Sequence, residues 1–134
     1  MDIIYTFKRN HRWVDRRIPP AFLRMLTLCQ QDLHRFQFTV NVIFQTGVSR
    51  NHDRYLGLCS LSKTDPCRMT IHLYTYRRPQ LLMAKTIAHE FGHVQHYLMH
   101  PGSWDWPEKK AEDYADQYAD QMMRRFASTF TANS

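Results

Sequence analysis

The sequence predicts an α+β fold, in which an N-terminal helix, a small, mostly antiparallel sheet of three strands and two C-terminal helices form one domain. Two observations support this fold. Apolar residues recur at helical spacing in three segments, at about 21–36, 80–98 and 107–127, and three segments between the first two helices alternate as strands do. The length of 134 residues also suits a single domain with a real core.

The first helix is expected from Ala21 to about Phe36, directly after two prolines, which are well tolerated in a first helical turn. Strands are then expected at 36–44, 55–61 and 68–76. Residues 3–7 are short, apolar and β-branched and could form an edge strand. The following segment, 8–18, is basic and is expected to be irregular.

The second helix is expected from Gln80 to about Leu98, because the sequence His100-Pro101-Gly102 stops it. Pro107 can open the last helix, with Glu108 in the first turn, where the helix dipole favours an acid. Residues 128–134 are expected to be a frayed tail. No repeat or linker is evident, so the whole chain, 1–134, is expected to be one domain with a core at about 20–127.

Charge and composition limit the location and the partners. The net charge of +6 makes nucleic acid a possible partner, although a soluble basic protein without that role is the alternative. The chain contains no apolar run of membrane-spanning length and no signal-peptide pattern, so neither membrane nor secretion is expected. Three cysteines suit reduced thiols in the cytoplasm better than a disulfide framework.

The most informative motif is His89-Glu90-Phe91-Gly92-His93, which fits the pattern His-Glu-x-x-His. Residues i and i+4 share one helical face, so the two imidazoles can bind one metal ion. Glu90 lies where it could polarise a water molecule on that ion. A catalytic zinc site needs one further protein ligand and leaves the fourth position to water.

Glu112 is the favoured third ligand, because it lies 19 residues after His93 on the next expected helix, which can return antiparallel. Asp113 and Asp116 are the alternatives, and a merely solvated acidic face is the other interpretation. Asp116 could instead accept a hydrogen bond from a ligand histidine and fix its tautomer. His96 and His100 lie too far along the same helix unless the chain turns back sharply.

The combination of His89-Glu90-x-x-His93 with Glu112-x-x-Ala115-Asp116 resembles the gluzincin type of zincin metallopeptidase. The similarity covers about 20–127 and extends to minigluzincins and to the catalytic cores of ImmA/IrrE-type and SprT-like proteins. It implies that His89, His93 and Glu112 bind Zn²⁺, that Glu90 is the general base, and that Asp116 supports a ligand histidine. It also implies that an extended peptide pairs with the 68–76 strand.

The function expected from this resemblance is a small zinc-dependent metallopeptidase that hydrolyses peptide bonds with metal-activated water. The alternative is a non-catalytic zinc-containing module that binds a partner or regulates it, possibly in association with nucleic acid. Any of four tyrosines could stabilise the oxyanion of the reaction: Tyr74, Tyr76, Tyr114 and Tyr118. Trp104 and Trp106 are expected to be packing or interface residues rather than substrate anchors.

Overall fold

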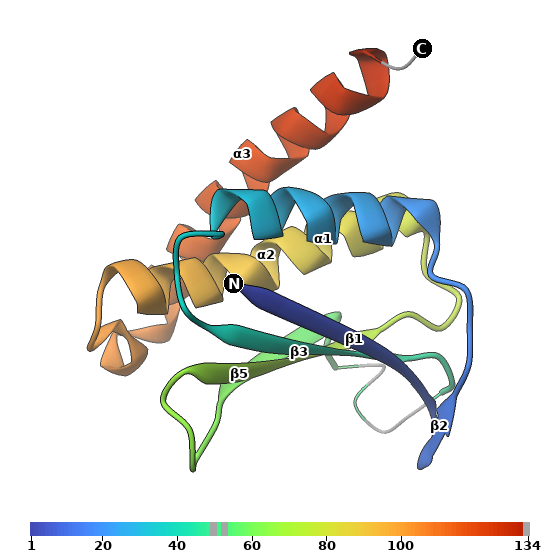
Figure 1. Cartoon of the computed structure of the whole chain (residues 1–134), viewed down its shortest axis with the longest axis horizontal. Helices are drawn as coiled ribbons and strands as arrows, with labels where there is room; N and C mark the ends of the chain where they lie inside the picture. The colour runs from blue at the N-terminus through green and yellow to red at the C-terminus, as the bar shows by residue number, and fades with distance from the viewer. Residues whose placement is uncertain (49–50, 52–53, 133–134) are drawn as a thin grey trace.

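A computed structural model describes residues 1–48, 51 and 54–132. In this part of the chain, five strands form one sheet, and three α-helices lie beside it (Figure 1). Helices α1 and α2 contact the sheet, and α3 packs on both of them. The elements are β1 (Asp2–Arg9), β2 (Arg12–Val14), α1 (Pro20–Asp32), β3 (Thr39–Gln45), β4 (Gly57–Leu61), β5 (Arg68–Tyr74), α2 (Gln80–Met99), a short 3₁₀ turn (Ser103–Asp105) and α3 (Glu108–Ala132).

The predicted sheet of three mostly antiparallel strands is wrong, although the α+β class holds. The strand order is β2-β1-β3-β5-β4, with β1–β3 and β3–β5 parallel and only the two outer pairs antiparallel. The order of elements also differs, since two strands precede the first helix. Residues 3–7 belong to β1, which lies inside the sheet rather than at its edge, between β2 and β3.

The error has a physical cause. Residues 8–18 carry exposed basic side chains, so their sequence shows no buried period, yet Arg12–Val14 pairs with β1 through backbone hydrogen bonds. Parallel pairing depends on α1, which carries the chain from β2 back across the sheet to β3, and a two-residue period is the same for parallel and antiparallel strands.

The core lies between the sheet and the helices and follows the expected alternation. Every second residue of β3 and β5 is buried, and the helices contribute the side chains that cover them. The core also reaches back to Phe7 in β1 and stacks it on Phe44 of β3, with ring centroids 5.0 Å apart. Removing such apolar surface from water is the main source of stability in a domain of this kind.

Helix α3 continues through Ala132, so the described part of the segment expected to be a frayed tail, 128–132, is helical. Residues 133–134 of that expected tail lie outside the described residues. Asp32, the last residue of α1, holds α3 in place. Its carboxylate accepts hydrogen bonds from the Tyr118 hydroxyl (3.0 Å) and from the Arg125 guanidinium (3.1 Å).

Among the described residues, no helix combines the length and the apolar character that crossing a bilayer requires. The three cysteines, Cys29, Cys59 and Cys67, are not joined in disulfides.

Candidate metal centre

The close crossing of α2 and α3 brings the two sequence motifs together. Gly92 of the first motif faces Ala115 of the second. A Cβ atom at Gly92 would lie 2.7 Å from Ala115 Cα and 2.9 Å from the Ala115 carbonyl oxygen. Real Cβ atoms do not approach backbone this closely, so any other residue at 92 would separate the helices. The glycine inside the motif therefore sets how near α3 comes to the histidines.

At this crossing, Glu112 of α3 meets both histidines of α2. Its carboxylate oxygens lie 2.8 Å from His89 Nε2 and 3.0 Å from His93 Nε2. The three residues offer one ligand atom each, all within 4.8 Å of one another. Of all described residues, these three alone form such a group of potential ligands, and they could hold a metal ion.

The donor set and its spacing fit a divalent metal. Tetrahedral bonds of about 2.1 Å from one ion separate neighbouring ligand atoms by about 3.4 Å, which lies between the shortest distance in the group, 2.8 Å, and the 4.8 Å within which all three ligand atoms lie. Burial lowers the pKa of His93, and the imidazole is then neutral near pH 7, which is the form that binds metals. Two imidazoles and one carboxylate are a common zinc set and leave a coordination position for water.

Asp116 lies on the far side of His89. Its carboxylate is 2.8 Å from His89 Nδ1, while His89 Nε2 faces Glu112. A carboxylate in this position makes Nδ1 the protonated nitrogen and leaves the Nε2 lone pair for a metal. The predicted contact of Asp116 with a histidine of the motif is present, its role in supporting a metal ligand stays a prediction, and Asp116 does not itself join the group of potential ligands.

Glu90 lies beside this group with its carboxylate in a largely dry position, since the residue is only 5% exposed. Burial, helped by the nearby Glu112 carboxylate, raises the pKa of Glu90 to about 8. Its carboxylate has no hydrogen bond to any residue that the structure describes. Gly57 at the start of β4 leaves room for it, because a Cβ there would lie 3.1 Å from Glu90 Cγ.

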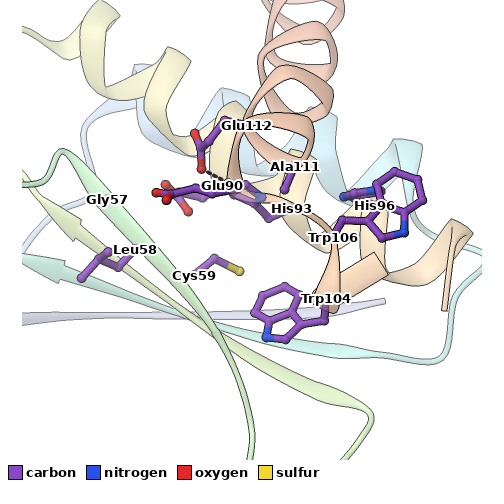
Figure 2. A pocket seen from close by; sticks show the side chains of 11 residues that line it. Gly57, Leu58, Cys59, Glu90, His93, His96, Trp104, Trp106, Ala111 and Glu112 are labelled. Carbon is purple, nitrogen blue, oxygen red and sulfur yellow. Dashed lines mark ion pairs between the residues drawn. The ribbon is translucent and has the colours of Figure 1, made fainter. Parts of the chain in front are cut away.

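Two hollows meet at Glu90 and Glu112. One, of about 320 Å³, lies between the first half of β4 and the loop before α3, with His93, Cys59, Trp104 and Trp106 in its wall (Figure 2). The other, of about 600 Å³, lies on the His89 side. It is lined by an apolar group of Tyr55, Leu56, Leu58 and Leu82 and by polar residues that include Lys85, Glu108 and Asp116. Together they form a cleft along β4, with the ligand group at its centre.

The remaining candidates lie elsewhere. Asp113 is exposed and lines a separate hollow on the other side of α3. His96 is buried and stacks on Tyr114, with ring centroids 4.1 Å apart, and His100 lies at the end of α2 against Trp106. Neither histidine belongs to the group of potential ligands.

The tyrosines suggested for the oxyanion do not line the cleft. The hydroxyl of Tyr114 bonds to Gln95 and that of Tyr118 to Asp32, and Tyr74 accepts a hydrogen bond from Asn51. Tyr76 packs under Arg77. None of the four is among the residues that line the two hollows of the cleft.

Sequence reasoning missed the wall opposite the helices. It did not anticipate that Gly57 and Cys59 of β4 face Glu90, and it assigned Trp104 and Trp106 to packing although both also line the cleft. The signal in the sequence was the glycine in a strand, which often marks a close approach of another part of the chain. No protein-family model, curated protein or solved structure matches this chain, so the resemblance to gluzincins stays a prediction.

Proposed function

We propose that this chain is a small zinc-dependent metallopeptidase, with His89, His93 and Glu112 as the metal ligands and Glu90 as the general base. One observation carries the proposal. Three residues from two helices, His89, His93 and Glu112, bring their ligand atoms close together. The buried Glu90 side chain lines the same cleft beside them.

A zinc ion at this site would act as a Lewis acid toward a peptide carbonyl and would make a water molecule more acidic. Glu90 would accept a proton from water in the cleft and then donate it to the leaving amine. Glu90 suits both steps because it is buried beside the three ligands and lines the same cleft, so its carboxylate is within the space where water and the leaving amine would lie. Asp116 would keep His89 in the ligating tautomer.

The substrate would be a peptide in extended conformation. The predicted contact with the 68–76 strand needs correction, because β5 has both edges paired, one with β3 and one with β4. The outer edge of the sheet next to the cleft belongs to β4, Gly57–Leu61. An extended peptide can add to such an edge by main-chain hydrogen bonds. We therefore assign peptide pairing to β4.

The test is cleavage of a complex peptide mixture by the purified, zinc-loaded protein, with products identified by mass spectrometry. Glu90→Gln should keep the metal and lower the cleavage rate by about 10²- to 10⁴-fold, the usual contribution of a general acid–base group. Asp113→Asn is the matched control, because it removes a carboxylate from the exposed side of the same helix as Glu112, and it should cleave at the wild-type rate.

The alternative function, a non-catalytic zinc module, is separated by the same experiment. It predicts a stoichiometric metal, no cleavage by the wild type, and a Glu90→Gln protein that differs in stability alone. Equal cleavage by wild type and Glu90→Gln would also contradict the proposal, since the activity would then come from another site or from a contaminant.

A further inference from the structure

The opposite edge of the sheet carries a second, unrelated surface. Strands β1 and β2 form a hairpin that turns at Asn10 and His11, and β2 is the outer strand at this edge, away from β4 (Figure 1). Residues 8–17, here called the basic hairpin, hold five of the chain's 18 Lys and Arg residues and a single acid, Asp15. Its basic residues are Lys8, Arg9, Arg12, Arg16 and Arg17.

These cations are not used to hold the fold together. All four arginines are exposed, and none of the five basic residues forms an ion pair with any residue that the structure describes. Charges of one sign on a short hairpin repel each other in the folded state, so the fold gains nothing from gathering them. A ligand of opposite charge would remove that repulsion.

An exposed tryptophan stands among the cations. Trp13 lies opposite Lys8 in the hairpin and is 61% exposed, the largest exposed fraction among the large apolar residues that the structure describes. The Lys8 ammonium lies 5.0 Å from the centroid of the indole ring and restrains it. Beside it is a hollow of about 380 Å³, lined by Trp13, Arg16 and the 39% exposed Tyr5, among others. An indole that is restrained on one side and mostly exposed offers a ring face on which another flat ring can stack.

We propose that the basic hairpin binds single-stranded nucleic acid, with Trp13 stacking on a base and Arg12, Arg16 and Arg17 contacting the phosphates. The chemistry of the surface favours this ligand. Arginine outnumbers lysine, and its planar guanidinium matches phosphate oxygens in pairs. The ring of an unpaired base stacks on indole whatever its sequence, whereas the bases of a duplex present only their edges in the grooves.

An anionic membrane is a less suitable ligand for this surface than a nucleic acid strand, because the surface lacks a continuous apolar face. Surfaces that insert into a bilayer combine cations with a continuous apolar face, usually along a helix. Here the exposed aromatic is a single indole on a strand, and the neighbouring hollow has Thr6, Asp15 and Arg16 in its wall. This binding site is separate from the metal centre, so it holds whether or not the chain is a peptidase.

The probe is a fluorescein-labelled oligothymidylate of about 12 nucleotides, within the length that a small single-strand binding surface covers, titrated with the whole chain by fluorescence anisotropy. We expect saturable binding whose affinity falls with salt. The slope of log K against log salt should be about −2, from the three phosphates that Arg12, Arg16 and Arg17 contact, at about −0.7 each. Binding with no salt dependence would overturn the proposal.

Two variants test the contacts. Trp13→Ala should weaken binding by about 5- to 150-fold, and Trp13→Phe by less, because a base–aromatic stack is worth about 1–3 kcal/mol. Arg12→Ala with Arg16→Ala should weaken binding and bring the salt slope closer to zero by about 1.4. Arg124→Ala with Lys109→Ala removes the same charge from exposed positions of α3 and is the matched control, with binding near the wild-type value.

Three results would overturn the proposal. In the first, the control pair weakens binding as much as the hairpin pair, so that the net charge alone is responsible. In the second, a duplex of the same length binds as tightly as the single strand, or Trp13→Ala binds like wild type, so that no base is stacked. In the third, vesicles containing phosphatidylserine bind the chain while the oligonucleotide does not.

Circular dichroism of each variant should match the wild type, because every substituted side chain except the partly packed indole is freely exposed.

Discussion

The two edges of the sheet carry opposite chemistry. The β4 edge faces a cleft with four carboxylates in its wall, those of Glu90, Glu108, Glu112 and Asp116, whereas the β2 edge carries the basic hairpin. At the first edge, charged side chains contact other side chains of the protein, as Glu112 contacts the two histidines. At the second, the charges face solvent. The net charge of +6 is an average over an acidic edge and a basic edge, so the binding properties of each edge must be tested separately.

The largest effect is expected from removing the third ligand. Glu112→Ala should weaken zinc binding by more than about 100-fold. Losing a residue that only hydrogen-bonds to a ligand costs up to about 100-fold, and losing a ligand itself should cost more. Competition with a chromophoric chelator measures this. Asp113→Ala should bind zinc as the wild type does, and both variants should bind the oligonucleotide normally, since sites this far apart act independently. Unchanged zinc affinity in Glu112→Ala would remove the metal centre as described.

The second effect is a pH dependence of stability in the metal-free protein. Burial raises the pKa of Glu90 to about 8 from an ordinary value near 4.5. The folded state then favours the protonated carboxyl, and this stabilisation is complete below the unfolded value and is lost as pH rises toward 8. Between pH 5 and pH 8 the loss is on the order of 3 kcal/mol.

Thermal unfolding in a chelator, across that pH range, tests this expectation against Glu90→Gln, whose side chain stays neutral. The wild type should lose stability relative to the variant as pH rises. Two parallel pH profiles would show that the Glu90 carboxylate is well solvated, contrary to its buried position.

The third effect concerns the helix crossing at the cleft. Gly92→Ala should lower the free energy of unfolding by about 1–3 kcal/mol, the usual cost of overpacking, and should also weaken zinc binding because α3 carries Glu112 away. Gly47→Ala, close to the hairpin, is the matched control, since its Cβ would meet its nearest neighbour, Arg9 Cγ, at an ordinary 3.4 Å. Chemical denaturation of both variants measures the difference, and equal stability would contradict the tight crossing.

A smaller effect is expected at the outer partner of His89. Asp116→Asn should weaken zinc binding by about 10- to 100-fold, because the amide orients His89 less firmly and does not raise the basicity of Nε2. Asp120→Asn, one turn further along the exposed face of α3, should have no effect. If Asp116→Asn and Asp120→Asn bound zinc equally well, the hydrogen bond to His89 would have no role in metal binding.

The smallest effect on zinc binding and peptide cleavage should come from a substitution in the basic hairpin. Trp13→Ala should leave zinc affinity and any peptide cleavage within about twofold of wild type, because distant sites without shared partners are additive. A large change in either quantity would mean that the two edges are coupled through the sheet and that the comparison between them fails.

The sequence predicted the grouping of His89, His93 and Glu112 better than it predicted the strand order of the sheet, and the reason is local geometry. His89, Glu90 and His93 are fixed relative to one another by one helical turn, so a pattern of five residues determines their arrangement. Glu112 could be proposed as the third ligand because a second helix that returns antiparallel after a short turn brings only a few of its residues near the two histidines. Strand order has no such short-range rule. Whether β5 lies inside the sheet or at its edge depends on where β4 pairs, and whether β1 pairs with β3 depends on the crossover through α1.

The wall of the cleft was hidden for a similar reason. Cys59 and Trp104 reach the ligand group only through the strand order and the loop before α3, and neither carries a pattern of its own. The basic cluster at 8–17 is evident in the sequence. The proposed nucleic-acid ligand, however, depends on the exposure of Trp13, and the sequence pattern does not reveal that a tryptophan on a paired strand is exposed.

X-ray absorption at the zinc edge, on protein loaded with one equivalent of zinc, tests the metal centre most directly. The account predicts one tightly held ion per chain with only nitrogen and oxygen neighbours at about 2.0–2.1 Å, including the outer-shell pattern of two imidazoles, and loss of that spectrum in Glu112→Ala. A sulfur neighbour at about 2.3 Å, which would implicate Cys59, or a spectrum unchanged in Glu112→Ala, would contradict it.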